Sequence, residues 1–270
     1  ACVEGESLMS GDLLHDVKEG VATITFNRPE TRNGLTPAFL LKFIDLFKQL
    51  ESDPTVRVLM LTGNGQDFSS GGDKGFLHEL KAMTPTEVRD VVYAAFLGAV
   101  RTVKLCAKPT VAAVNGAAVG AGCDLAFMCD LRLASTTAQF GEVFVNLGII
   151  PGDAGSWFLP RRIGYQLAAE MTFTGRLVGA EEALAKGLVL KVVPPEALLA
   201  EAKALAGVIA SKPPRAVRQA KRLLRAAEAM DLANFLELAA ANQALAHHTG
   251  DHIEAVKAFL EKRKPSFKGG

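Results

Sequence analysis

Two glycine-rich segments each follow an apolar run and could place free backbone N–H groups around one oxyanion. NGAAVGAGCDLAFMCDLRLA (115–134) follows the apolar run 110–114, and GNGQDFSSGGDKGF (63–76) follows the run 56–62. A strand, a glycine turn and a helix N-terminus together form an anion site, because unpaired N–H groups and the helix dipole favour negative charge. Two such turns would compose an oxyanion hole, which stabilises an enolate or a tetrahedral intermediate.

The surrounding sequence predicts the elements that must hold these turns. Thr36 and Pro37 suit the cap and first position of a helix, and apolar residues recur at helical spacing from Phe39 to Leu50. Strands are predicted over 21–26, 56–61, 110–114 and 188–193, with a helix end and a short strand within 127–134. Helical stretches are predicted over 88–103 and 195–264, the latter broken at 212–214 and 248–250. This order indicates an α/β core followed by a helical C-terminal region.

Bulk composition excludes several classes of function. The 270 residues carry 30 Lys and Arg against 29 Asp and Glu, a formal net charge of +1 without a strongly basic block, so nucleic acid is not an expected partner. The longest apolar runs are too short for a bilayer, so no membrane association is expected. Four cysteines, none in a C-x-x-C pair, indicate a reduced, cytoplasmic setting, and Cys123 and Cys129 fit small buried hydrophobes.

Five segments resemble, in order, motifs of the crotonase (enoyl-CoA hydratase/isomerase) superfamily. They are DFSSGGD, NGAAVGAGCDLAFMCDLRLA, AQFGEVFVNLGIIPGDAGSWFLPRRIG, TGRLVGAEEALAKGLV and AFLEKRKPSFKG. The resemblance covers nearly the whole chain, and five motifs in register are far more specific than one. It implies an α/β crotonase fold, with repeated ββα units in two roughly perpendicular sheets and a helical C-terminal region. The expected divisions are an irregular segment at 1–10, native or added, a core at 11–200 and a helical oligomerisation region at 201–270.

The resemblance also implies roles for residues near the turns. The oxyanion donors would be the backbone N–H groups of Gly72 and Ala121. Arg28 and Arg32 would approach the CoA phosphates, with ordinary surface arginines as the equal alternative. Phe267 and Lys268 match a segment that touches CoA in relatives, sometimes that of a neighbouring subunit. The expected substrate- and CoA-binding residues are Arg28, Arg32, Ser70, Gly72, Asp73, Phe144, Phe267 and Lys268. No metal and no cofactor beyond the CoA of the substrate are expected.

The acid–base groups depart from the hydratase pattern. Hydratases of this family use two glutamates, one acting on the water and the other managing protonation. Asp124 occupies the first position, and Phe144, which cannot move a proton, occupies the second. Asp124 is expected to face the pocket with a raised pKa, the alternative being a buried carboxylate hydrogen-bonded to the backbone. Glu142 could substitute if the segment is extended, since it would then point to the same side as Phe144.

Asp153, in PGDAGSW, is the second candidate carboxylate. Relatives with other chemistry, including dienoyl-CoA isomerases and the chlorobenzoyl-CoA dehalogenase, carry an aspartate at or one place before this point. The alternative for Asp153 is a helix N-cap, because Asp followed by Ala-Gly-Ser-Trp fits a helix start. A carboxylate can cap a helix and face a pocket at once, so both interpretations are retained.

Together these residues predict an acyl-CoA enzyme that forms a thioester enolate. Gly72 and Ala121 would hold the thioester oxygen, and Asp153, Asp124 or both would move the proton. Isomerase-like chemistry is favoured over hydration because Phe144 replaces the second glutamate. The alternatives are a hydrolase, dehalogenase or C–C hydrolase that uses Asp153, or a non-catalytic acyl-CoA binder.

The expected partners are the acyl-CoA substrate and further copies of the chain in a homotrimer or hexamer. The expected compartment is the cytoplasm, with the mitochondrial matrix as the alternative. His247, His248 and His252 are expected to be surface residues rather than metal ligands, next to a helix N-cap at Thr249 or Asp251.

Overall fold

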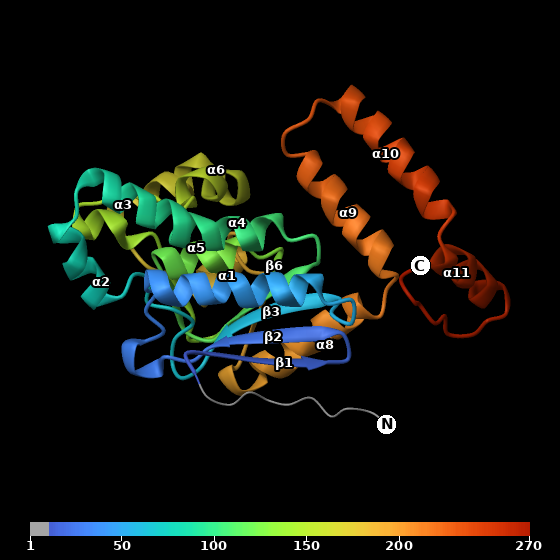
Figure 1. Cartoon of the computed structure of the whole chain (residues 1–270), viewed down its shortest axis with the longest axis horizontal. Coiled ribbons are helices and arrows are strands. Elements are labelled where there is room, and N and C mark those ends of the chain that lie inside the picture. The colour runs from blue at the N-terminus through green and yellow to red at the C-terminus, as the bar shows by residue number, and fades with distance from the viewer. Residues whose placement is uncertain (1–10) are drawn as a thin grey trace.

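A computed structural model describes residues 11–270, and its main sheet brings together strands from the whole core (Figure 1). The strand order is β1-β2-β3-β4-β6-β9. Every neighbouring pair is parallel except β1 and β2, so the carboxyl ends of five strands meet at one edge. The strands are β1 (Leu13–Lys18), β2 (Val21–Phe26), β3 (Val58–Gly63), β4 (Thr110–Val114), β6 (Leu131–Ser135) and β9 (Lys191–Val193).

A second sheet of three short strands lies beyond that edge and carries the downstream glycine turn. Its order is β5-β7-β8, comprising β5 (Ala117–Val119), β7 (Gln139–Gly141) and β8 (Val178–Gly179). Two sheets are thus present, as the family resemblance implies. Strand β5 was not predicted, because three small residues between glycines give no strand periodicity.

The main sheet is buried on both faces, as its strand sequences require. Alternate residues of each strand point to opposite sides, so Ile24 and Leu61 enter one cluster while Val58 and Met60 enter the other. Helices α1 (Pro37–Ser52), α4 (Leu97–Leu105) and α5 (Ala121–Met128) belong to the first side, and α8 (Leu198–Ala210) covers the second. Helix α8 crosses the expected boundary at residue 200 and packs with the core.

Helix α1 confirms the prediction made from its cap and periodicity. The Thr36 side chain accepts a hydrogen bond from the Phe39 N–H, and Pro37 is the first helical residue. The six apolar residues expected on one face are all buried, and they are Phe39, Leu40, Phe43, Ile44, Phe47 and Leu50. Phe26 of β2 meets Phe39 and Phe43 edge-on at centroid distances of 5.6 and 5.7 Å, which fixes α1 across the sheet.

The predicted helical stretch over 88–103 is continuous but not uniform. It comprises α3 (Pro85–Val91), a π-helical turn at Val92–Phe96, and α4. The remaining core helices are α2 (Lys74–Glu79), α6 (Gly155–Thr174), which is kinked at Gly164, and α7 (Ala180–Ala185). Each described helix is too short or too polar to traverse a lipid bilayer.

The last three helices form an arm that projects from the core (Figure 1). They are α9 (Pro214–Ala226), α10 (Leu232–His247) and α11 (Gly250–Leu260). The breaks expected at 212–214 and 248–250 are confirmed, and Thr249 caps α11. A further break at 227–231 was not predicted. The expected irregular segment at 1–10 lies outside the described residues.

Candidate active site

The two predicted glycine turns meet in space, at the carboxyl-end edge of the main sheet. Ser69 pairs with Ala118 in a parallel bridge, which lays the loop after β3 alongside β5. The approach is so close that a methyl group on Gly71 would lie 2.6 Å from the Val119 carbonyl oxygen and 3.5 Å from the Ala121 nitrogen. Gly71 also has φ +84°, so both space and backbone conformation require glycine here.

The pairing of the first turn leaves the polar groups of Gly72 free. In the bridge between Leu35 and Gly72, the Leu35 N–H donates to the Gly71 oxygen and the Asp73 N–H donates to the Leu35 oxygen. A parallel bridge made by the neighbours of Gly72 turns its own N–H and C=O to the opposite side. Within residues 11–270 the Gly72 N–H has no backbone acceptor and the carbonyls of Ser70 and Gly72 have no backbone donor.

The second turn exposes its N–H groups by starting a helix. Ala121 is the first residue of α5, so its N–H has no intrahelical acceptor. The preceding Gly120 adopts φ +53° and ψ −127°, and its N–H donates to the Gly141 oxygen of β7 at 2.8 Å. The two N–H groups named for an oxyanion hole therefore belong to two turns in direct contact.

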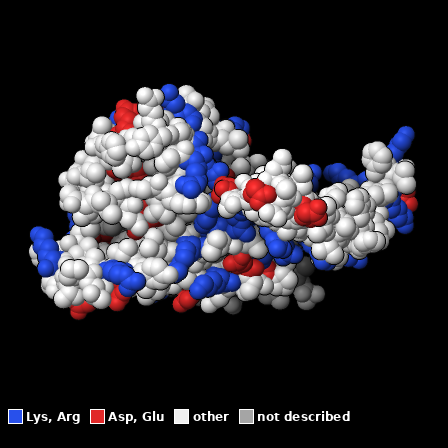
Figure 2. Space-filling model, turned by 90° about the horizontal axis from the view of Figure 1, so that it is seen from above, with Lys and Arg blue, Asp and Glu red and all other residues white. Residues whose placement is uncertain are grey.

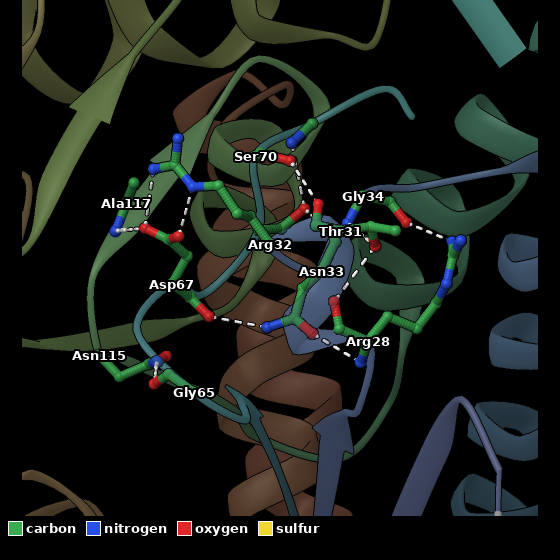
Figure 3. Close-up of polar contacts among 12 residues, drawn as sticks. Arg28, Thr31, Arg32, Asn33, Gly34, Gly65, Asp67, Ser70, Asn115 and Ala117 are labelled. Atoms are coloured by element: carbon green, nitrogen blue, oxygen red, sulfur yellow. Dashed lines mark hydrogen bonds and ion pairs between the residues drawn. The ribbon is translucent and has the colours of Figure 1, made fainter. Parts of the chain in front are cut away.

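The loop 28–34 is fastened to the first turn by two arginines (Figure 3). The Arg28 guanidinium donates to the Gly34 oxygen at 2.6 Å and lies 3.5 Å from Asp73. Arg32 donates to both carboxylate oxygens of Asp67, at 2.6 and 3.1 Å, and holds the Asp67 pKa below its ordinary value. The Arg28 and Arg32 side chains both hold this loop in place, and the Arg32 side chain remains 64% exposed. Their contact with CoA phosphates stays a prediction.

The C-terminal tail lies at the other end of the molecule from the first turn (Figure 1). The Phe267 oxygen accepts a hydrogen bond from Arg57, which lies at the amino end of β3, whereas the glycine turns follow its carboxyl end. The Lys268 N–H donates to buried Asp251 of α11 at 2.8 Å. Within one chain Phe267 and Lys268 are therefore not brought to the turns. A contact with the CoA of a neighbouring subunit stays a prediction.

Three carboxyl groups gather beneath the second turn. Asp124 of α5 and Glu142, which follows β7, are fully buried at 0% exposure, and Asp153 is 7% exposed. No donor among residues 11–270 reaches the carboxylate oxygens of Asp124 or Glu142. A methyl group on Gly155 would lie 2.5 Å from Glu142 Oε2 and 2.9 Å from Asp124 Oδ1, so both carboxyl groups converge on the start of α6.

Burial makes these carboxyl groups hard to ionise. Desolvation raises the pKa of Asp153 from 3.8 to about 6. It also raises the pKa of Glu142 from 4.5 to about 7, although the neighbouring Cys123 and Asp124 side chains act in the opposite direction, and the charge of Asp153 adds to the rise. The pKa of Asp124 is raised well above its ordinary value, first by desolvation and then by the charges of Glu142 and Asp153. Groups with such pKa values can accept and return protons near neutral pH.

Only one of the three carboxyl groups lines the apolar pocket beside the second turn. The lining consists of Leu35, Leu40, Phe96, Ala99, Val100, Ala121, Leu125 and Asp153. Asp153 therefore shares a pocket with the proposed oxyanion donor Ala121. Asp124 is not among the lining residues. The raised pKa expected for Asp124 is confirmed. The alternative of a hydrogen bond to the backbone is wrong, because no donor among the described residues reaches its carboxylate. A catalytic role for Asp124 stays a prediction.

Asp153 does not cap a helix, which corrects one of the two interpretations. Helix α6 begins at Gly155, and its N-cap is Ala154 at φ +89° with no side-chain capping bond. The left-handed Ala154 separates Asp153 from the helix start, so its carboxylate is free to line the pocket.

Glu142 and Phe144 diverge, because the expected extended segment is absent. Glu142 has φ −92° and ψ 65°, and a 3₁₀ helix follows at Val143–Leu147. The period-2 argument that would place both side chains on one side therefore does not apply. Glu142 turns inward to Asp124, whereas the Phe144 ring lies 3.6 Å from the Cβ position of Gly120, beside the second turn.

A second opening, a groove of about 630 Å³, lies at the carboxyl ends of β3 and β4. Arg32, Asp67 and Asn115 contribute to its wall, and it shares no lining residue with the pocket of Asp153. The described residues contain no group of three or more His, Cys, Asp and Glu side chains arranged to hold a metal ion. His247 and His252 contact each other at 3.1 Å on the arm.

Comparison with known proteins gives one consistent result. A family model described as enoyl-CoA hydratase/isomerase matches residues 16–270. A crotonyl-CoA hydratase of Syntrophomonas wolfei is 38% identical over 257 residues, covering 95% of this chain and 97% of the relative. A short-chain-enoyl-CoA hydratase of Clostridium acetobutylicum is 38% identical over 92% of this chain and 94% of its own length.

Solved structures agree with the sequence comparison. The crystal structure of an enoyl-CoA hydratase from Bacillus anthracis superposes with a TM-score of 0.91 at 35% identity, covering 96% of this chain and all of that chain. The match extends over both sheets and the arm, and the fold expected from the motifs is confirmed. The chain belongs to the enoyl-CoA hydratase/isomerase family and has the crotonase fold.

Proposed function

We propose that this protein acts on an unsaturated acyl-CoA by stabilising a thioester enolate and moving one proton, with isomerisation as the outcome. The observation that carries the proposal is the position of Asp153. Its carboxylate lines the same pocket as Ala121, and no other carboxylate lines that pocket. Isomerisation needs one group that removes a proton at one carbon and returns it at another, and a single pocket carboxylate suits that task.

The backbone supplies the electrostatic part of this mechanism. The N–H groups of Gly72 and Ala121 would donate to the thioester oxygen as it gains negative charge in the enolate. Glycine turns fix these donors before the substrate binds, so little reorganisation accompanies the reaction. The apolar side chains that line the pocket would exclude water, which strengthens both hydrogen bonds.

Hydration is the second candidate, favoured by the names of the relatives and by Glu142. A hydratase needs two groups that manage a water molecule, and Phe144 occupies the position at which relatives carry their second glutamate. The cluster nevertheless contains an acidic pair, Asp124 and Glu142, which could supply the missing proton if it reached the pocket. In this structure the pair is buried away from the pocket lining, so isomerisation is the better-supported outcome.

Solvent deuterium exchange into a panel of 2-enoyl-, 3-enoyl- and saturated acyl-CoAs, read by mass spectrometry, tests the proposal. Isomerisation predicts deuterium in a product whose double bond has moved, without a gain of water. A gain of one water would establish hydration. No deuterium exchange and no gain of water with any acyl-CoA of the panel would favour the hydrolase, dehalogenase or binder alternatives. A covalent acyl adduct at Asp153 after a rapid quench would then select the alternatives in which Asp153 is the nucleophile.

Asp153→Asn provides the matched test of the role of this carboxylate. Its turnover should fall by about 10²- to 10⁴-fold, the usual contribution of a general acid–base group, with the Kd for acyl-CoA nearly unchanged. Asp16→Asn, the same change at an exposed position of β1, is the control and should retain full turnover. Wild-type turnover in Asp153→Asn would remove Asp153 from the mechanism.

We further propose that copies of this chain associate through the arm as a trimer or hexamer in the cytoplasm. The arm exposes large apolar side chains along α10 and α11, with Phe259 at 82% exposure. In Figure 2 much of the arm is white, with Lys, Arg, Asp and Glu side chains scattered along it. Exposed apolar surface on this scale indicates a protein interface. Sedimentation of the wild type and of Phe259→Ser measures this association. A monomeric wild type would refute the proposed oligomer.

A further inference from the structure

The buried contact between Asp124 and Glu142 has no role in the proposed chemistry, although it is the most unusual polar feature of the core. Both side chains are at 0% exposure, and no N–H or O–H donor of residues 11–270 reaches their four oxygens. A buried polar group without a partner costs about 1–3 kcal/mol, and more when it is charged. Some compensation is therefore required.

The geometry supplies that compensation only if a proton lies between the two carboxyl groups. Both lie beside Gly155, where a Cβ methyl group would be 2.5 Å from Glu142 Oε2 and 2.9 Å from Asp124 Oδ1. Two ionised carboxylates so placed repel each other and satisfy nothing. One protonated carboxyl group donates its O–H to the other, which partners one oxygen of each group and leaves the pair with a single charge.

We infer that Glu142 is a positioning residue that shares a proton with Asp124 behind the pocket, so that Asp153 is the carboxylate that becomes ionised and faces the substrate. The inference rests on the proposed function for its use in catalysis, but the shared proton itself does not. The other ionisable neighbours are Asp153, which adds negative charge, and the buried thiol of Cys123. The causes of the raised pKa values of the two carboxyl groups include no basic side chain, and a proton between the two groups can supply the counter-charge.

The start of α6 explains why the pair can keep one negative charge. Gly155 is the first residue of this helix, and the positive end of a helix dipole favours an anion beside it. The pair thus resembles one delocalised charge held by a helix end. Removing the Glu142 carboxyl group should lower the proton affinity of Asp124, because a repelling neighbour is replaced by a neutral one.

Carbon-13 NMR of protein labelled at the Asp carboxyl carbons tests this without any need for turnover. The Asp124 signal is assigned by its loss in Asp124→Asn, and its titration midpoint is compared between the wild type and Glu142→Gln. A fall of one pH unit or more, a tenfold loss of proton affinity, is expected. Glu30→Gln, at an exposed position, is the matched control and should leave the midpoint in place.

An unchanged Asp124 midpoint in Glu142→Gln overturns the inference, whatever the activity of the variant. If Glu142→Gln does not fold, Asp124→Asn with labelled Glu carboxyl carbons gives the reciprocal measurement, because coupled sites shift each other equally. If the Asp124 midpoint shifts but the protein has no activity towards acyl-CoAs, the proposed function is refuted and the proton-sharing pair is still supported. Where activity is present, Glu142→Gln should shift the pH profile of deuterium exchange and leave the Kd for acyl-CoA unchanged.

Discussion

Replacing Asp153 by Asn should make the protein relatively more stable as the pH rises. In the folded protein burial raises the Asp153 pKa from 3.8 to about 6, so the native state keeps its proton over a range in which the unfolded chain has lost it. The proton therefore contributes stability that is fully present below about pH 4 and is lost as the pH rises through about 6. Asn carries no such proton, so the free energy of unfolding of the variant lacks this dependence.

The size of the effect follows from the difference between the two pKa values. One pKa unit corresponds to about 1.4 kcal/mol, so a difference of roughly two units gives about 3 kcal/mol over the whole range. Much of this is already lost at pH 5, and linkage leaves about 1.4 kcal/mol to be lost between pH 5 and pH 8. The free energy of unfolding of Asp153→Asn, relative to that of the wild type, should therefore rise by this amount between pH 5 and pH 8.

Urea unfolding at pH 5, 6, 7 and 8, at one fixed protein concentration, measures the difference directly, since association would otherwise shift the apparent stability. Asp16→Asn on exposed β1 is the control, and its offset from the wild type should stay constant because that carboxyl group is hydrated in both states. A constant difference between the free energies of unfolding of the wild type and Asp153→Asn at all four pH values would contradict the burial argument for Asp153.

Three further changes address the parts that position the site. Thr36→Ala removes the cap of α1 and should lower the free energy of unfolding by about 1 kcal/mol in urea. Gly71→Ala forces a methyl group to within 2.6 Å of the Val119 oxygen and should reduce α-proton exchange at least ~10²-fold, whereas Gly148→Ala, with φ +70° but open space, should not. Asp251→Ala removes the acceptor for the backbone of the C-terminal tail and should make that tail susceptible to limited proteolysis, with wild-type resistance as the refuting result.

The sequence was informative wherever local chemistry determines structure. The cap at Thr36, the helical spacing after it and the strand before Asn115 are short-range features, and the structure confirms each. The meeting of the two glycine turns was also predictable, because strands followed by such turns end at one edge of a parallel sheet. By contrast, β5 was missed, since its three small residues form a strand only through pairing with β7.

The acidic cluster shows where prediction from sequence fails. The expectation for Glu142 depended on its being in an extended segment, and a 3₁₀ helix after it reverses the argument. The expectation for Asp153 as a cap required the helix to start at Ala154, but it starts at Gly155 and the left-handed Ala154 is its N-cap. Both errors concern one or two residues of backbone, a scale at which pattern reasoning has little resolving power.

One signal in the sequence could have located the buried pair. Gly155 begins α6, yet it has no positive φ, so no backbone requirement explains a glycine at the first position of this helix. What excludes a side chain there is the approach of the Glu142 and Asp124 oxygens to within 2.5 and 2.9 Å of the Cβ position. A glycine at a helix start, after an aspartate and near a lone glutamate, therefore marks the space that two carboxyl groups occupy. The chemistry of this site is thus determined as much by the side chain that is absent as by the three acids that are present.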